Sequence, residues 1–222
     1  MLFRSNDTAT TEIYTTLDTL SLHDALPISL VAIGAAVGNL MGGWIGDKAA
    51  KWRPNSGRII ISQISVFSGI PLSYVIFILI PATTDSMILF VVLGAITGLL
   101  ISWCSAQNYT IFSEVFEPEI RSTVYSVDRV FEGSVAALGT VIVGLIAGFL
   151  GYVTPSVAIS QLPTAVRVTD MTALAQGMFI AAVIPWTLCL IFYTFVYKTY
   201  PGDREKNRQV LEKRRLELEQ AG

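Results

Sequence analysis

Long apolar blocks alternate with short polar connections along most of this sequence. The blocks cover about residues 30–46, 59–80, 87–106, 122–151 and 171–197. A helix that crosses a lipid bilayer needs roughly 20 mainly apolar residues, and the last four blocks reach that length. The first block is shorter, as expected if its beginning is missing. The pattern predicts an all-α integral membrane protein with five transmembrane helices, which would have the lipid bilayer as its first partner.

Composition supports this prediction and excludes several other classes of protein. The chain has 222 residues, of which 52% are hydrophobic and only 14% are charged, whereas soluble domains carry about 25% charged residues. Cys104 and Cys189 both lie inside apolar blocks, so we expect free buried thiols rather than a disulfide or a metal site. The net charge of −2 indicates no nucleic-acid partner. We find no nucleotide loop and no catalytic triad, so we expect neither a cofactor nor an enzyme.

The cations are distributed unevenly between the two sides that five alternating spans define. Twelve Lys and Arg residues lie in 47–58, in 113–121 and after residue 197, whereas the two other connections hold only Arg167. The positive-inside rule therefore predicts that the first group, and with it the C-terminus, is cytosolic. Residues 201–222 would form a charged, helical tail. This tail would be either a solvated extension or a segment in weak contact with anionic lipid headgroups.

The connection between the first two blocks carries the most informative motif. Residues 30–58 read LVAIGAAVGNLMGGWIGDKAAKWRPNSGR, with glycines that let two helices approach closely, an Asp that can cap a helix, and a basic cluster. This stretch resembles the loop between paired helices of major facilitator transporters, described as G-x-L-x-D-R-x-G-R. The corresponding places are held by Gly43, Ile45, Asp47, Lys48 and Lys51, with Ala50 in place of the second Gly and with Arg53 and Arg58 following.

A second motif lies between the third and fourth blocks. Glu114 and Arg121 are separated by six residues around Pro118, which resembles the E-x6-R pattern of the same transporters. We expect the next helix to start near Ser122, a candidate N-cap. The resemblance implies a cytosolic gating network of Asp47, Arg53 or Arg58, Glu114 and Arg121. The alternative is that these are solvated charges of two turns.

Three charged residues follow inside the fourth apolar block, at Asp128, Arg129 and Glu132. Each charge costs about 2.5–3.5 kcal/mol in the hydrocarbon on insertion scales, so the three must face water, a partner helix or one another. They are candidates for the transport pathway: Asp128 or Glu132 would couple transport to protons, and Arg129 would hold an anionic group. The alternative is a mutually neutralised cluster that fixes packing or an inter-domain contact.

The N-terminal residues do not resemble the rest of the chain. Residues 2–28 read LFRSNDTATTEIYTTLDTLSLHDALPI, which is polar and Thr-rich and has no helical or strand period. The stretch resembles a conceptual translation of sequencing adapters. We therefore expect residues 1–29 to be artefactual or, as the alternative, a natural disordered tail.

Taken together, GGWIGDKAAKWRPNSGRIIISQ, YSVDRVFEG and TYPGDREKNR resemble the spinster-like branch of the major facilitator superfamily found in plants and algae. The resemblance implies that residues 30–200 form helices eight to twelve of the C-terminal half, although helices two and three carry the same loop motif. It also implies a missing N-terminal half of the same transporter as a partner. The implied function is alternating-access transport of a small organic or lipid-like solute, with protons as candidate coupling ions, across a plasma membrane or endomembrane. The alternatives are a non-transporting membrane scaffold or receptor and an intramembrane enzyme.

Overall fold

All regular secondary structure in the part of the chain that the structure describes is helical. The structure is a computed structural model, and it describes residues 22–81, 84–153 and 162–221. The helices are α2 (Leu22–Trp52), α3 (Gly57–Tyr74), the π-helix η1 (Val75–Leu79), the 3₁₀-helix η2 (Thr84–Ser86), α4 (Met87–Val115), α5 (Pro118–Phe149) and α6 (Thr164–Ala221).

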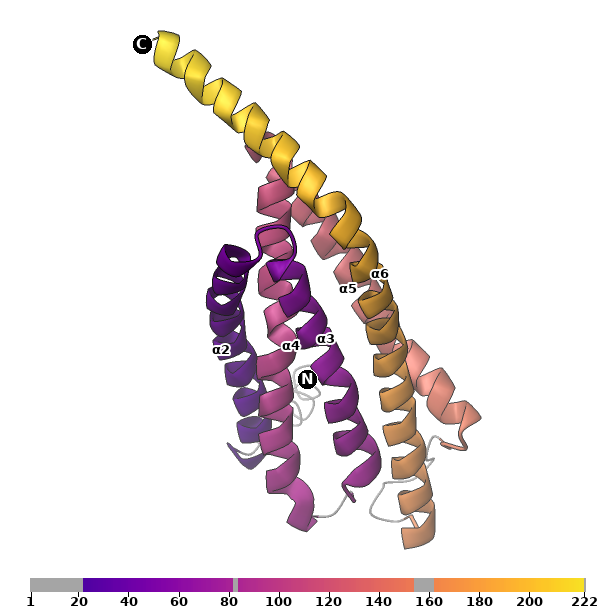
Figure 1. Cartoon of the computed structure of the whole chain (residues 1–222). Helices are drawn as coiled ribbons and strands as arrows, with labels where there is room; N and C mark the ends of the chain where they lie inside the picture. The colour runs from indigo at the N-terminus through magenta and orange to yellow at the C-terminus, as the bar shows by residue number, and fades with distance from the viewer. Residues whose placement is uncertain (1–21, 82–83, 154–161, 222) are drawn as a thin grey trace, which may run out of the picture.

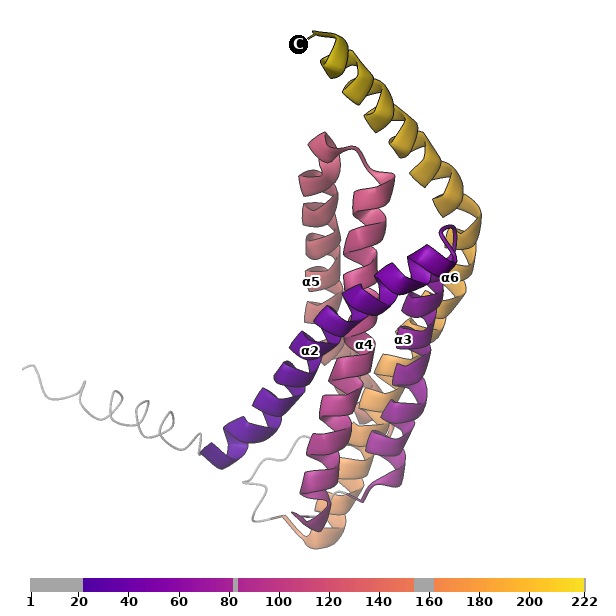
Figure 2. The same ribbon diagram turned by 60° about the vertical axis from the view of Figure 1, so that its left-hand side comes forward.

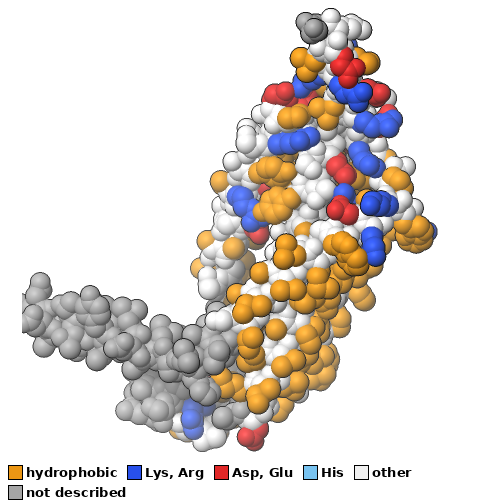
Figure 3. Space-filling model, turned by 90° about the vertical axis from the view of Figure 1, so that its left-hand side faces the viewer, with side chains coloured by type: hydrophobic (Ala, Val, Ile, Leu, Met, Phe, Trp, Pro, Cys, Tyr) orange, Lys and Arg blue, Asp and Glu red, His pale blue; other side chains and the backbone are white. Residues whose placement is uncertain are grey.

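The prediction of five transmembrane helices is confirmed. Five helices in the described residues are long and apolar enough to cross a membrane, and the protein is an integral multi-pass membrane protein. Many large apolar side chains are exposed on their outer faces, as lipid contact requires, and Figure 3 shows such a face below a charged end. The long helices α2, α3, α4, α5 and α6 run alternately up and down (Figure 1).

Several helix ends differ from the predicted ones. The fourth span starts at Pro118 and not near Ser122, because proline suits the first position of a helix, where its fixed φ fits and its missing N–H is not needed. The predicted charged, helical tail at 201–222 follows directly on the last span. It continues α6 without a break as far as Ala221, and it projects beyond the bundle (Figures 1 and 2).

The start of α2 lies within the segment 1–29. α2 begins at Leu22, so the backbone of residues 22–28 is helical, although the sequence there has no helical period. A helix that packing has nucleated extends cheaply into adjacent residues, which accounts for this. Residues 1–21 lie outside the described residues.

Helix α4 is the centre of the bundle. It packs against α2 and α3 and also touches α5 and α6, while α3 and α5 each pack on α6. The backbones of α2 and α4 lie close together, since a Cβ added to Gly38 would lie 2.1 Å from the carbonyl oxygen of Leu99. Glycines on α2 thus let the two backbones meet, as the sequence pattern predicted.

The remaining core lies between α3, α4 and α6. Its buried apolar residues are Ile59, Val66, Ile111, Tyr193 and Tyr200. Cys104 and Cys189 pack against this cluster as free thiols, as predicted, although both are half-buried rather than fully buried. The core is therefore concentrated toward the end of the bundle at which α2 joins α3 and α4 joins α5.

Candidate functional site

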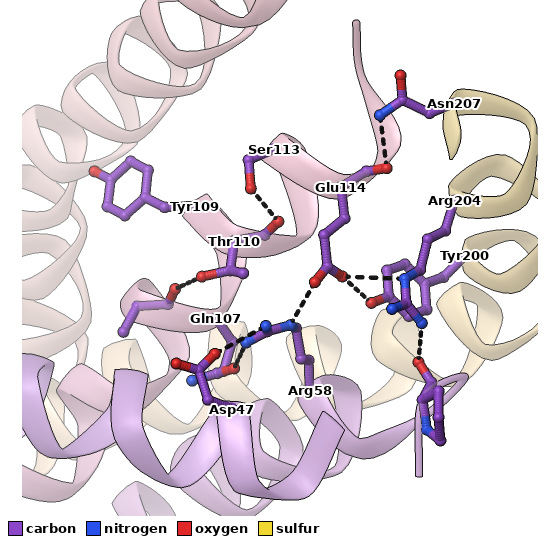
Figure 4. A network of polar contacts seen from close by, with 12 residues as sticks. Asp47, Arg58, Gln107, Tyr109, Thr110, Ser113, Glu114, Tyr200, Arg204 and Asn207 are labelled. Carbon is purple, nitrogen blue, oxygen red and sulfur yellow. Dashed lines mark hydrogen bonds and ion pairs between the residues drawn. The ribbon is translucent and has the colours of Figure 1, made fainter. Parts of the chain in front are cut away.

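A buried arginine joins three helices at this end of the bundle. The Arg58 side chain, only 8% exposed, lies in the first turn of α3. Its Nη2 donates to Asp47 Oδ1 of α2 at 2.9 Å, and its Nε donates to Glu114 Oε1 of α4 at 3.0 Å (Figure 4). A guanidinium is suited to this place because its planar fork can serve two carboxylates at once.

Gln107 completes the environment of Arg58 from α4. This side chain is fully buried; its Nε2 donates to the Gly42 carbonyl of α2 at 2.7 Å, and its Oε1 accepts from Arg58 Nη1 at 3.4 Å. A Cβ at Gly46 would lie 2.0 Å from Gln107 Oε1. Gly46 therefore leaves the space that Gln107 occupies.

Glu114 also receives contacts from α6, where the predicted tail begins. The Tyr200 hydroxyl donates to its Oε2, and Arg204 Nε lies 3.7 Å from the same oxygen. Arg204 Nη1 donates to the Pro54 carbonyl in the α2–α3 connection at 2.7 Å, and Asn207 Nδ2 donates to the Glu114 carbonyl at 2.9 Å (Figure 4). The network thus connects α2, α3, α4 and α6.

The three charges of α5 lie together in the structure. Arg129 Nη1 lies 2.9 Å from Glu132 Oε2, whereas its Nη2 is 3.9 Å from Asp128 Oδ2. The guanidinium also stands over the Tyr109 ring of α4, 4.9 Å from the ring centroid. Because α5 starts at Pro118, Asp128 lies about 15 Å along the helix, deeper than a start at Ser122 would place it.

These charges line a pocket of about 550 Å³ between α5 and the helices α3, α4 and α6. Uncharged polar groups in its wall come from Ser105 and Asn108, and apolar groups come from α3, α5 and α6. A second pocket of about 600 Å³ has an almost wholly apolar lining and shares Ile101 and Trp186 with the first. One bundle therefore contains a charged pocket with an apolar neighbour.

Comparison with known families decides the kind of protein. The family model of the Major Facilitator Superfamily matches residues 8–219. The chain belongs to the major facilitator superfamily. Members of this superfamily are transporters, and the predicted resemblance is confirmed at that level. No curated protein and no solved structure matches the chain.

Finer parts of the resemblance stay predictions for this major facilitator protein. The spinster-like branch is one of them. The adapter origin of residues 2–28 is another, and the family match begins inside that segment, at residue 8.

The structure brings together part of the predicted gating network of this superfamily member. Asp47, Arg58 and Glu114 are joined by ion pairs, but Arg53 and Arg121 are engaged elsewhere. Arg53 stands over the Trp52 ring at 4.5 Å, and Arg121 Nε donates to the Phe116 carbonyl at 2.9 Å. Both arginines adjoin helix ends, where a neighbouring ring or free carbonyl satisfies them locally.

The other motif residues of the α2–α3 turn lie outside this network. Lys48 stands over the Trp44 ring at 4.0 Å, and Lys51 is exposed at the end of α2. A Cβ added to Gly43 would meet no heavy atom within 4 Å, in contrast to one added to Gly42 or Gly46. The motif position of Gly43 therefore does not contribute to the close α2–α4 contact.

Sequence reasoning missed the contributions of Gln107 and of α6. Gln107 is an amide at the end of the third apolar block, beside Asn108, and this was the available signal, since a buried amide needs partners. Tyr200 and Arg204 are four residues apart and so share a helix face. Their partner, Glu114, is 86 residues from Tyr200, and no local pattern predicts that pairing.

Proposed function

We propose that this chain forms part of a secondary transporter that moves a small organic or lipid-like solute by alternating access. In this proposal, residues 30–200 correspond to helices eight to twelve of the C-terminal half of a spinster-like transporter. The observation that carries the proposal is the pocket of about 550 Å³ lined by Asp128, Arg129 and Glu132. Ionisable residues inside a membrane are costly, so they favour a function in a solute or ion pathway.

The Arg58 network supports a gating role for the same end of the bundle. Arg58 is buried and joins carboxylates of α2 and α4, and leaving its charge buried without these partners would be costly. Arg214 instead makes half-exposed contacts with the start of α5 from the extension of α6, and such pairs contribute little stability. We therefore propose that α2, α3 and α4 move as one unit, while the Arg214 contacts between the α6 extension and the start of α5 break and re-form during transport.

The proposal includes three partners. The first is the bilayer, which the five spans require. The second is an N-terminal half of the same transporter, against which this bundle would rock around the solute. The third is the solute itself, with protons taken up by Asp128 or Glu132 as the candidate coupling ions. The cationic end, with the C-terminus, would face the cytosol.

The experiment that tests this proposal starts from the transcript. Long-read sequencing across the codons for Pro27 to Val31 would identify the coding sequence that joins Leu30. If the adapter-like codons are genuinely transcribed there, the proposal of a missing N-terminal half is wrong.

The encoded protein is then reconstituted in liposomes, and the solutes that it takes up from a mixture are identified by mass spectrometry. We expect Asp128→Asn and Glu132→Gln to remove most of the uptake and Asp85→Asn, an exposed carboxylate outside the pocket, to preserve it. Uptake no greater than in protein-free liposomes would reject transport. Binding of a partner protein without solute flux would favour a scaffold or receptor.

A further inference from the structure

We infer that the pocket between α5 and the helices α3, α4 and α6 binds an organic cation with an apolar body. This inference rests on the proposed function and adds the charge class of the solute. The charge of the pocket lining is its first support. Asp128 and Glu132 contribute two carboxylates against the single guanidinium of Arg129, and the other residues that line the pocket are uncharged.

The placement of Arg129 makes this guanidinium a poor anion site. Its Nη1 is 2.9 Å from Glu132 Oε2, and its plane stands over the Tyr109 ring. An anionic solute would have to compete with the Glu132 carboxylate for the same N–H groups. Arg129 therefore acts as the internal counter-ion of Glu132, and not as the solute-binding group that the sequence suggested.

Asp128, in contrast to Glu132, is not closely paired with Arg129. Its Oδ2 lies 3.9 Å from Arg129 Nη2, which is longer than a charge-assisted hydrogen bond. The Asp128 side chain is 31% exposed. The carboxylate thus keeps acceptor capacity toward the pocket. Since an uncompensated charge at membrane depth is costly, a cation that neutralises this carboxylate gains more than a neutral or anionic solute would.

Trp186 gives the pocket an aromatic wall suited to a cation. A Cβ at Gly69 would lie 2.7 Å from a carbon of the Trp186 ring, so this glycine leaves the space in which the ring sits. The face of an indole attracts ammonium groups. Trp186 and Ile101 also line the apolar pocket next to it. A solute with its cationic group near Asp128 would thus have apolar space for the rest of its body.

Two probes of matched size and opposite charge test this inference. Phenyltrimethylammonium and benzenesulfonate are titrated into the purified full chain in an uncharged maltoside detergent, and binding is measured by isothermal calorimetry against empty micelles. We expect the ammonium probe to bind at least about tenfold more tightly than the sulfonate, a difference of about 1.4 kcal/mol. Size-exclusion profiles confirm that each variant remains monodisperse.

Variants identify the site of binding. Asp128→Asn should weaken the ammonium probe about tenfold, and Asp85→Asn, which removes an exposed carboxylate outside the pocket, should not. The double variant Asp128→Asn with Glu132→Gln leaves Arg129 as the one charged residue in the described lining, so it should reverse the preference toward benzenesulfonate.

Three results would overturn the inference: equal affinity for the two probes, ammonium binding that Asp128→Asn leaves unchanged, or no binding of either probe. None of them bears on transport itself, because liposome uptake of an unrestricted solute mixture tests the proposed function separately. Uptake of anions or neutral solutes together with any of these results would retain the transporter and reject its cation selectivity.

Discussion

At the scale of single residues, Arg58 is a charged side chain that is buried where three helices meet. Its buried guanidinium must find acceptors, and Asp47, Gln107 and Glu114 supply them from two other helices. The cost of burying the charge is thereby offset only when all three helices are in position. Arg58 consequently stabilises this end of the bundle only when α2, α3 and α4 are packed together.

Replacing Arg58 by leucine should lower the thermal stability of the protein in detergent micelles. The Glu114 carboxylate, 21% exposed, would lose its closest cation. We expect a cost of about 2–3 kcal/mol, somewhat below that of a fully orphaned buried charge because Arg204 remains near Glu114. The midpoint of thermal unfolding measures the effect. Arg53→Leu is the matched control, since Arg53 stacks on Trp52; equal losses in both variants would contradict the role of Arg58.

At the scale of helices, the face of α2 that carries glycines sets the distance to α4. A Cβ at Gly34, Gly38 or Gly42 would lie 2.1–2.7 Å from the nearest backbone atom of α4. Helix backbones cannot yield as a flexible side chain can. The spacing of four residues keeps these positions on one face, so the contact extends along the helix pair.

Gly38→Ala should therefore destabilise the bundle, against the usual trend for helices. In an exposed helix interior, Gly to Ala stabilises by about 1 kcal/mol. At Gly38 the added methyl group would meet the Leu99 carbonyl and force α2 away from α4. Thermal unfolding of Gly38→Ala and Gly43→Ala compares the two cases on one helix. An unfolding midpoint of Gly38→Ala equal to or above that of Gly43→Ala would disprove the close-packing argument.

The extension of α6 is held against the start of α5 by a second arginine. Arg214 Nη1 lies 2.6 Å from Glu119 Oε1, and Nη2 contacts Glu117. Arg215 instead pairs with Glu219 within the extension, at 2.9 Å. Arg214 therefore pairs with residues at the start of another helix, whereas the adjacent Arg215 pairs within its own helix.

Arg214→Ala should loosen the extension, whereas Arg215→Ala should have little effect on it. Both Arg214 pairs join the extension to the start of α5, so their loss should measurably speed amide exchange in residues 203–221, although exposed ion pairs contribute little stability. Hydrogen–deuterium exchange with mass spectrometry gives the measurement. Identical exchange in the two variants would show that the extension does not depend on its contacts with α5.

At the scale of the whole molecule, the connections fall at two ends that differ in charge. The α2–α3 connection, the α4–α5 turn and the C-terminus lie at one end, where the α6 extension leaves the bundle (Figures 1 and 2). Figure 3 shows Lys and Arg side chains gathered toward that end. The alternation predicted from cations and spans is therefore matched by the arrangement of the helices.

Single cysteines at the two ends should react differently in intact cells. In a background with Cys104 and Cys189 replaced by serine, Asn55→Cys should be protected from a membrane-impermeant maleimide and Asp85→Cys should be labelled. Both positions are exposed, and they lie in the connections on either side of α3. Both should react after permeabilisation. The reverse pattern in intact cells would place the cationic end outside the cytosol.

The sequence by itself determined the number, order and alternation of the helices. Hydrophobic length decides whether a segment can span a bilayer, and this depends on each block alone. The family was also readable, because the α2–α3 motif and the E-x6-R pattern are local. The same reasoning found Asp47 and Glu114, but it left Arg53 and Arg58 as equal candidates.

Only the tertiary structure decided which charges meet. The turn after Trp52 leaves Arg53 beside an indole, whereas the start of α3 directs Arg58 between α2 and α4. Tyr200 and Arg204 reach Glu114 because α6 passes the end of α4. Pairing between helices depends on their distance and rotation, which the spacing along one chain does not encode.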